Sequence, residues 1–407
     1  MKNTFSRRKF MLTSAATLSG AVAFGHSALP TMTLSQSDKD NPIRVGLIGS
    51  GSRGSGIAHV LKELPGISLM ACCDVIPAHL EKGMSLADKG AKAYTDYRQL
   101  LDDKSLDAVI IAVPLYLHAA VGGDAIEAGK HIYMEKTMTY DIPQALEMVK
   151  KVNASDKVFQ IGHQYRYYAL YHKVQEILEK GWCGEVTHFE CQYHSNHDWR
   201  RPVPEPKLER QINWRMYREY SGGLMAELCA HQIDIVNWMT GSHPVKVSGL
   251  GGIDYWKDGR ETFDNVRTIF EYPNGVKANV SSVLTNAFKG YSIRVLGTKA
   301  TLEIQRDKAF LYPEASQREV GVVDGVSGAT VKAWTQGEPS LIEFEKPGEE
   351  GVDPTTYALL DFAKCIRENK KPFSNVETGR DVALAVHMGN QAMREEKYQY
   401  WQPEYSL

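Results

Sequence analysis

Short, continuous apolar segments alternate with helical patterns through the first part of the chain. The apolar segments cover residues 44–49, 67–74, 107–113, 131–136 and 158–162, and amphipathic stretches separate them. Strands that are apolar on both faces and connected through helices are typical of a parallel sheet with helices on both sides. The pattern predicts an α/β domain over residues 41–163, built on a doubly wound parallel sheet.

A different pattern follows residue 163. Apolar and polar side chains alternate over residues 185–194, 245–251, 265–272, 275–284, 291–296 and 300–304. Consecutive strands without intervening helices indicate an antiparallel sheet with one open face. We therefore predict a second α/β domain over residues 164–407, with a large, open, mainly antiparallel sheet and helices between residues 355 and 395.

The first 40 residues fit neither domain. Arg7 and Arg8 precede Lys9 and Phe10, and the following residues 11–25 carry no charge. That run is shorter than the ~20 residues that span a bilayer, so it is typical of a removable export signal. We interpret residues 1–40 as a twin-arginine signal peptide and tether, which predicts periplasmic or other export by the twin-arginine machinery.

The composition of the chain indicates which class of molecule it can bind. Charged residues make up 24% of the 407 residues and the net charge is -2, so nothing favours nucleic acid or an anionic membrane. A small neutral molecule fits this balance better. The six cysteines show no paired spacing, and adjacent Cys72 and Cys73 point to opposite faces of a strand, so we predict free, buried thiols.

A glycine-rich turn, Gly49-Ser50-Gly51-Ser52-Arg53-Gly54, joins the first strand to the first helix. Such glycines let the backbone approach a pyrophosphate, and Asp74, about 20 residues later, can accept hydrogen bonds from a ribose. A carboxylate there disfavours a 2′-phosphate, so we predict NAD rather than NADP, although Arg53 could accommodate the phosphate. Export favours a tightly bound cofactor, because free dinucleotide is not dependably supplied outside the inner membrane.

Four motifs in a fixed order give the chain a family resemblance. They are the glycine turn, Val113-Pro114 with His118, Met134-Glu135-Lys136, and Gly222-Gly223 followed by Glu227, His231 and Asp234. Together they resemble the Gfo/Idh/MocA oxidoreductase family from residue 42 to the end. The resemblance implies a Rossmann domain that binds NAD and a C-terminal domain whose open sheet faces the nicotinamide. It adds these cofactor-binding candidates: Pro114, His118, Glu135, Lys136 and Gln164.

Lys136 is the first catalytic candidate. It falls at the carboxyl end of a parallel strand, where doubly wound sheets bind their ligands. Its side chain can hydrogen-bond the reacting hydroxyl as hydride leaves the carbon. Similar family members usually have proline after this lysine, whereas this chain has Thr137, so its local backbone departs from the family pattern.

Three polar residues, Glu227, His231 and Asp234, have the spacing i, i+4 and i+7, which would place them on one face of a helix. We predict that His231 acts as a general base. Glu227, one turn away, can bind substrate, orient His231, or do both, and we assign Asp234 to substrate binding. The family pattern more often has aspartate at the position of Glu227.

Aromatic rings and bidentate hydrogen-bond donors can bind sugars, and the second domain contains several residues of both kinds. The candidate substrate residues are Tyr193, His194, His197, Trp214 and Arg215, while Gln164 and Arg166 are expected near the nicotinamide. His194, His197 and Asp198 could instead bind a metal ion. No second cluster with zinc spacing accompanies them, so we predict no metal site.

These residues predict an exported NAD(P)-dependent oxidoreductase that acts on a sugar, sugar derivative or polyol by hydride transfer at a secondary alcohol or ketone. The alternative is a redox-neutral, NAD-dependent glycoside hydrolase, in which oxidation, elimination, water addition and re-reduction complete one turnover. A non-enzymatic dinucleotide-binding protein would not need Lys136, Glu227 and His231. The open sheet favours a homo-oligomer, and the identity of the sugar and of the oxidised carbon stays open.

Overall fold

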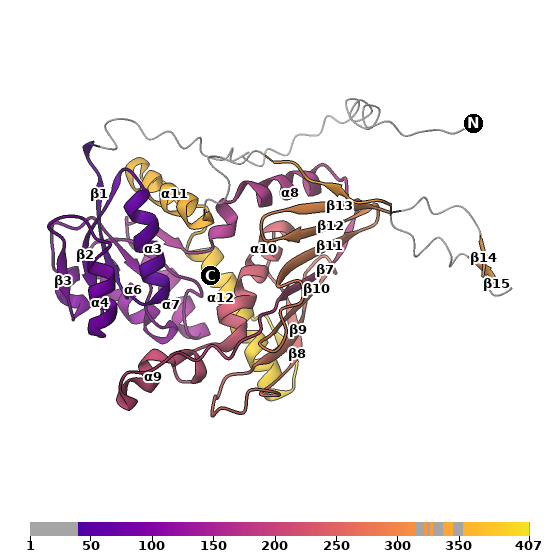
Figure 1. Ribbon diagram of the computed structural model, residues 1–407. Coiled ribbons are helices and arrows are strands. Elements are labelled where there is room, and N and C mark those ends of the chain that lie inside the picture. Colours follow the sequence, from indigo (N-terminus) through magenta and orange to yellow (C-terminus); the bar gives the residue numbers. More distant parts are fainter. Residues whose placement is uncertain (1–39, 315–320, 324–325, 329–336, 345–352, 407) are drawn as a thin grey trace. The chain divides into compact units, whose positions relative to one another are not determined.

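The computed structural model describes residues 40–314, 321–323, 326–328, 337–344 and 353–406 (Figure 1). The predicted signal peptide lies outside the described residues, as does the tether up to residue 39. The described chain forms two sheets with helices packed around them, as predicted from the alternation of apolar segments.

Six parallel strands form the first sheet in the order β3-β2-β1-β4-β5-β6. They are β1 (Ile43–Ile48), β2 (Ile67–Cys73), β3 (Lys92–Tyr94), β4 (Ala108–Ile111), β5 (His131–Met134) and β6 (Phe159–Ile161). The strand order reverses between β1 and β4, and β4 is buried along its whole length. In doubly wound sheets, ligands bind at the carboxyl ends of the strands beside such a reversal.

Helices alternate with these strands along the chain. They are α3 (Ser52–Glu63), α4 (Pro77–Met84), α5 (Tyr97–Leu101), α6 (His118–Glu127) and α7 (Ile142–Asn153). The Asp141 side chain caps α7 by accepting the Gln144 backbone N–H, and Asp96 caps α5 in the same way. Helix α3 instead follows Gly51, which offers no side-chain cap and leaves its first turn open to a ligand.

The second sheet has nine strands in the order β16-β13-β12-β11-β7-β10-β9-β8-β17. They are β7 (Val186–Tyr193), β8 (Lys246–Gly252), β9 (Asn265–Glu271), β10 (Lys277–Val283), β11 (Tyr291–Gly297), β12 (Ala300–Gln305), β13 (Ala309–Pro313), β16 (Ser340–Leu341) and β17 (Gln399–Tyr400). Only β10 and β7 pair in parallel, and every other neighbouring pair is antiparallel. The predicted fold class is therefore confirmed. A separate hairpin joins β14 (Gly321–Val323) to β15 (Val326–Gly328).

Helices that follow the first sheet in sequence cover both sheets. They are α8 (Ala169–Glu179), α9 (Glu209–Ile212), α10 (Ala230–Thr240), α11 (Pro354–Glu368) and α12 (Val376–Glu395). Helices α10 and α12 pack on the second sheet, whereas α11 packs beside α3 on the first (Figure 1). The buried Gln160 side chain of β6 donates to the Ala358 carbonyl of α11 at 2.7 Å. The predicted division at residue 163 is thus crossed by a helix that follows the second sheet.

All six cysteines lie among the described residues, and each is a free thiol with a buried side chain. Burial raises the pKa of the Cys183 thiol to about 11 and that of Cys72 to about 12. Such thiols stay protonated and unreactive at neutral pH. In the described part of the chain, no helix combines the length and apolar character of a membrane span.

Candidate active site

A cavity of about 640 Å³ opens at the carboxyl ends of the first-sheet strands and continues beneath the second domain. Its wall joins the end of β1, the end of β5 and the start of α10. Most residues predicted to bind cofactor or substrate line it, namely Gly49, Gly51, Ser52, Arg53, Asp74, Pro114, His118, Glu135, Lys136, Gln164, Trp214, Arg215, Glu227 and His231. The predicted cofactor and catalytic residues therefore share one space.

The glycine turn is shaped by close backbone contacts. Gly49 has a φ of 91°, and a Cβ there would lie 2.6 Å from the Ala112 carbonyl oxygen. A Cβ at Gly54 would lie 1.9 Å from the Gly49 carbonyl oxygen, so Gly54 allows the backbone of the turn to pack closely. Gly54 does not line the cavity. These contacts exclude larger residues and leave the N-terminus of α3 facing the cavity, as pyrophosphate binding requires.

Asp74 follows β2 at the cavity wall. Its carboxylate accepts the Ser50 N–H at 2.8 Å and the Ile76 N–H at 2.9 Å. Two backbone donors hold the carboxylate beside the glycine turn, and its remaining lone pairs can accept hydroxyl hydrogens. This arrangement suits a ribose diol and disfavours a phosphate at the same position.

Arg53, within the turn, is engaged by other protein groups. Its Nε donates to Glu135 at 2.8 Å, and one terminal nitrogen donates to the Thr355 hydroxyl of α11 at 3.1 Å. The guanidinium is therefore already neutralised by a carboxylate. A 2′-phosphate would have to compete with Glu135 for this charge.

Lys136 follows β5 and reaches across to the second domain. Its Nζ donates to the Glu227 carbonyl oxygen at 2.6 Å and lies 3.4 Å from the Ala226 carbonyl oxygen. Burial lowers the pKa of Lys136, and the Glu227 carboxylate only partly opposes this effect. A lysine with a lowered pKa can exchange a proton near neutral pH more readily than an ordinary one.

The backbone after Lys136 is held by Thr137, the residue that stands where family members usually have proline. The Lys136–Thr137 peptide bond is cis. The Thr137 hydroxyl donates to the Ala226 carbonyl oxygen at 3.0 Å, and its carbonyl oxygen lies 2.8 Å from Nδ1 of the buried His118. Thr137 and His118 therefore fix the segment that carries Lys136.

The helix that carries the acid and histidine motif begins with a π turn, η5 (Met225–Cys229), which continues into α10. A π turn has i→i+5 hydrogen bonds, so residues four apart no longer lie directly above one another. Glu227 does not hydrogen-bond His231. It pairs instead with Arg215, whose Nε lies 2.6 Å from its carboxylate. Burial would raise the pKa of Glu227, but the charges of Arg215 and Lys136 outweigh it, and the pKa is lowered.

His231 faces the cavity as a neutral imidazole. Burial, reinforced by the nearby charge of Lys136, lowers the pKa of His231 well below its ordinary value. Its ring packs against Tyr165, with centroids 5.1 Å apart, and Nδ1 has no hydrogen-bond partner among the described residues. A neutral imidazole at a cavity wall is suited to accept a proton.

Four predicted substrate residues do not line the cavity, namely Tyr193, His194, His197 and Asp234. Asp234 is buried and accepts two hydrogen bonds from Arg166 Nε, at 2.8 and 3.0 Å, so both residues are committed to each other. Tyr193 lies near His231, with ring centroids 6.4 Å apart, and its hydroxyl accepts a hydrogen bond from Arg306. His194 Nε2 lies 3.4 Å from the Ser281 hydroxyl.

The alternative metal cluster does not form. Nδ1 of His197 accepts the Trp199 N–H at 3.2 Å, and Asp198 accepts the Arg200 N–H at 3.0 Å. Across the ranges that the structure describes, no group of three or more potential ligands is arranged to hold a metal ion.

Several residues that line the cavity were not predicted from the sequence. The segment between β7 and η5 supplies Arg201, Arg210, Gln211, Ile212 and Tyr220 as well as the predicted Trp214 and Arg215. It is irregular and has no apolar period that marks a face. Its concentration of arginine and aromatic residues is the one signal that pointed to a binding surface.

Comparisons with known proteins match both domains. Residues 43–163 match the family described as "Oxidoreductase family, NAD-binding Rossmann fold", and residues 171–303 match the "GFO/IDH/MocA C-terminal domain". The solved structure of levoglucosan dehydrogenase in complex with NADH and L-sorbose has a TM-score of 0.71 at 20% identity, covering 88% of this chain and 99% of that chain. It shares the two-domain fold.

Two relatives align along most of the sequence. Glycosyl hydrolase family 109 protein 2 of Shewanella sp. (strain MR-4) is 26% identical over 91% of this chain and 84% of its own length. The scyllo-inositol 2-dehydrogenase (NAD(+)) of Bacillus subtilis (strain 168) is 24% identical over 86% of this chain and 93% of its own length. The similar proteins thus include both a dehydrogenase and a glycosyl hydrolase.

Proposed function

Because the chain belongs to the Gfo/Idh/MocA oxidoreductase family, we propose that it is an exported, NAD-dependent enzyme that transfers hydride at a secondary alcohol or ketone of a sugar, sugar derivative or polyol. The observation that carries the proposal is that Lys136 and His231 line the same cavity as the glycine turn. Proton-transferring groups beside a dinucleotide groove suit alcohol oxidation. The relative named for scyllo-inositol oxidation supports this substrate class.

The residues present fit NAD. The glycine turn and the uncapped start of α3 would hold the pyrophosphate, and Asp74 would hold the adenosine ribose. The buried Gln164 side-chain oxygen lines the cavity without a partner among the described residues, so it can accept a hydrogen bond from the cofactor. When bound, NAD supplies the hydride acceptor and donor. We propose that the cofactor is held tightly and that NADP is disfavoured by Asp74.

The chain's own residues would handle the proton. His231 is neutral and lines the cavity, so it can accept the hydroxyl proton as the alcohol is oxidised. Lys136, fixed on the Glu227 and Ala226 carbonyl oxygens, keeps an ammonium beside the oxygen on which charge develops. In the reverse direction the same two groups return the proton to the carbonyl oxygen.

A second candidate is a redox-neutral glycoside hydrolase, favoured by the glycosyl hydrolase family 109 relative, which aligns along 91% of this chain. The same cavity residues would serve it, because that reaction also begins by removing a hydroxyl proton. It consumes no cofactor, which suits an exported protein.

One experiment distinguishes the dehydrogenase from the glycoside hydrolase. The folded protein is purified without added cofactor, tested for bound dinucleotide, and assayed with sugars, polyols and aryl glycosides. Stoichiometric NADH formation from a sugar or polyol supports the dehydrogenase. Aglycone release without a net change in NADH absorbance supports the hydrolase, and absence of bound or bindable dinucleotide contradicts both.

Export is tested separately through the two signal arginines. Arg7→Lys with Arg8→Lys is expected to leave the precursor in the cytoplasm, because the twin-arginine pathway reads this pair. Fractionation with a periplasmic marker measures the outcome. Undiminished export of the doubly substituted protein would contradict this part of the proposal.

A further inference from the structure

Three arginines that line the cavity are neutralised by carboxylates. The pairs and their N–O distances are Arg53 with Glu135 at 2.8 Å, Arg215 with Glu227 at 2.6 Å, and Arg210 with Glu219 at 3.0 Å. A paired guanidinium offers a ligand little net charge. These three arginines therefore do not by themselves predict an anionic substrate.

Arg201 differs from these three. It lines the same cavity, its residue is exposed, and in the described part of the chain no carboxylate lies within ion-pair distance of its guanidinium. Burial, followed by the charge of Arg215, lowers the pKa of Arg201. Because a guanidinium stays protonated in proteins, this charge persists without a counterion from the chain.

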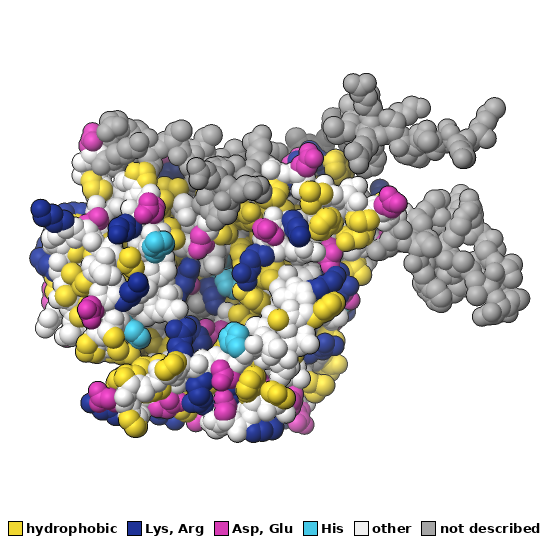
Figure 2. All heavy atoms as spheres, in the orientation of Figure 1, with side chains coloured by type: hydrophobic (Ala, Val, Ile, Leu, Met, Phe, Trp, Pro, Cys, Tyr) yellow, Lys and Arg dark blue, Asp and Glu magenta, His cyan; other side chains and the backbone are white. Residues whose placement is uncertain are grey.

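The unmatched charge lies toward the catalytic end of the cavity. Arg215, the neighbour whose charge acts on Arg201, pairs with Glu227, and the Glu227 carbonyl oxygen receives the Lys136 ammonium. Figure 2 shows that Lys and Arg side chains gather around the hollow in the middle of the visible face. Arg201 is thus close enough to Arg215 to feel its charge, and Arg215 pairs with the residue whose carbonyl oxygen binds Lys136.

The backbone of Arg201 is held by a buried side chain. Asn213, only 2% exposed, accepts the Arg201 N–H at 2.8 Å and donates to the Arg201 carbonyl oxygen at 3.1 Å. Both backbone polar groups of Arg201 are therefore satisfied by one amide. These bonds hold Arg201 in place where it lines the cavity.

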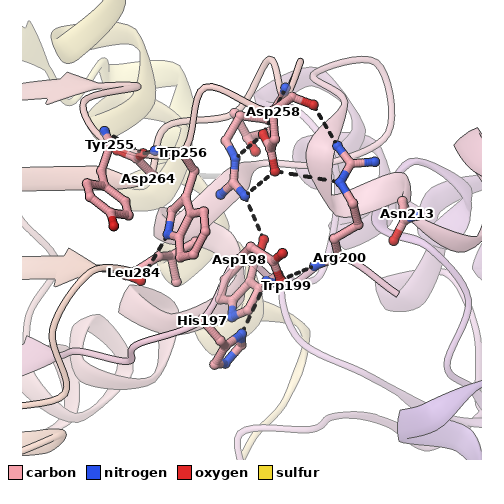
Figure 3. Close-up of polar contacts among 12 residues, drawn as sticks. His197, Asp198, Trp199, Arg200, Asn213, Tyr255, Trp256, Asp258, Asp264 and Leu284 are labelled. Carbon is pink, nitrogen blue, oxygen red and sulfur yellow. Dashed lines mark hydrogen bonds and ion pairs between the residues drawn. The ribbon is translucent and has the colours of Figure 1, made fainter. Parts of the chain in front are cut away.

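The residues before Arg201 are fixed by an ionic network (Figure 3). Arg200 donates to the Asp258 carbonyl oxygen at 3.0 Å, and the buried Arg260 donates to the Asp198 carbonyl oxygen at 2.7 Å. Arg260 also forms two hydrogen bonds with the Asp258 carboxylate, at 2.9 and 2.8 Å. The segment that presents Arg201 is therefore anchored, as a binding residue requires.

We propose that Arg201 binds an anionic group of the substrate, so that the enzyme acts on a sugar that carries a carboxylate or a phosphate. A guanidinium matches both groups with two parallel hydrogen bonds. The inference rests on the proposed function for its reaction. It adds the chemical class of the substrate and a residue that selects it.

The test measures binding to the NAD-loaded protein by calorimetry at constant ionic strength. The ligands are glucose, glucuronate, glucose 6-phosphate and tartrate, of which tartrate probes the anion site without a sugar ring. The proteins are the wild type, Arg201→Gln, and Arg218→Gln, which removes the same charge from the same segment outside the cavity lining. We expect at least one anion to bind the wild type and Arg218→Gln about tenfold or more tightly than glucose, and Arg201→Gln to lose that preference.

The comparison of glucuronate with glucose 6-phosphate identifies whether the site prefers a carboxylate or a phosphate. Equal binding of glucose and all anions, or no binding of any anion, overturns the inference. The inference is also overturned if Arg201→Gln keeps the preference for anions. It is overturned as well if Arg201→Gln loses affinity for NAD and not for the anion, since Arg201 would then bind the dinucleotide. Anion-selective binding without hydride transfer would support this inference and contradict the proposed function. Turnover of neutral sugars without a preference for anions would support the proposed function and contradict this inference.

Discussion

Lys136 is the residue on which the proposed chemistry depends most directly. Replacing it with methionine keeps most of its apolar volume and removes the proton donor. We expect Lys136→Met to lower kcat by about 10²- to 10⁴-fold, while NAD affinity measured by fluorescence titration changes little. Lys180→Met, at an exposed site, is the matched control. Activity of Lys136→Met within tenfold of the wild type would contradict the assignment.

The lowered pKa of Lys136 also predicts a pH profile. For alcohol oxidation, kcat/KM should fall at high pH as Lys136 loses its proton, because the neutral amine no longer stabilises the charge that develops on the reacting oxygen. The apparent pKa of this fall should lie below the ordinary lysine value of 10.5. His231 does not produce this fall, because its pKa lies well below 6.5 and it is already neutral. If the same fall persists in Lys136→Met, another group controls it.

Two buried histidines outside the cavity make stability depend on pH. Burial lowers the pKa of both His163 and His387 to about 4. Between pH 6.5 and 4 the unfolded chain binds protons that the folded chain does not, so acidification through this window reduces the free energy of unfolding. The reduction reaches about 3 kcal/mol for each histidine. Urea unfolding measured across this pH range tests the expectation.

His387→Gln isolates one contribution. His387 Nε2 lies 2.9 Å from the Thr139 carbonyl oxygen, and a glutamine amide can keep a donor near it without titrating. The pH dependence of unfolding should therefore be shallower in His387→Gln than in the wild type. An identical slope would assign the acid sensitivity to other groups.

Among the elements, α11 follows the second sheet in sequence but packs on the first sheet. Its buried Phe362 packs edge-on against Tyr133 of β5, with ring centroids 5.9 Å apart. Phe362→Ala should lower the free energy of unfolding by about 3–5 kcal/mol, because it leaves a cavity between α11 and the first sheet. Phe288→Ala, at a ring that is 72% exposed, should change it by less than about 0.5 kcal/mol. Denaturant titration of both variants measures the difference.

Hydrophobic periodicity predicted the two sheets well because it acts on whole elements. The predicted strand at 44–49 differs by one residue from β1 (Ile43–Ile48), and the predicted strands at 265–272 and 275–284 correspond to β9 and β10. The placement of α11 on the first sheet was not predictable in this way. An amphipathic pattern shows that a helix buries one face, but not which sheet receives that face.

The site was predictable where it depends on strand ends and less so where it depends on local helical geometry. Lys136 and Asp74 follow parallel strands, and the structure brings both to the cavity. The π turn leaves no mark in the spacing of Glu227, His231 and Asp234, so the expected common face does not form. Arg201 lies in an irregular segment, and only tertiary contacts place it at the cavity.

For the whole molecule, the open face of the second sheet predicts assembly. Leu250 of β8 and Ile269 of β9 point away from α12 and are 78% and 47% exposed. Tyr400 of β17, which is opposite Lys246 of β8, is 55% exposed. Adjacent apolar side chains on an exposed sheet face favour contact with a second copy. We expect a homo-oligomer, and Leu250→Glu with Ile269→Glu should convert it to a monomer.

Light scattering coupled to size-exclusion chromatography checks this expectation. Phe288→Glu places the same charge at another exposed apolar site and should leave the assembly unchanged. A monomeric wild type, or a double variant that keeps its mass, would show that this face is not the interface.

The hydrogen bond between Arg53 and Thr355 joins residues 302 positions apart. The ribosome makes α3 long before α11, so a nascent chain that ends before α11 lacks the Thr355 hydroxyl that binds Arg53 of the glycine turn. The contacts around the dinucleotide groove are therefore complete only after α11 has been made. For a protein proposed to cross the membrane already folded, we expect the cofactor to reach its full affinity after α11 has been made and before export.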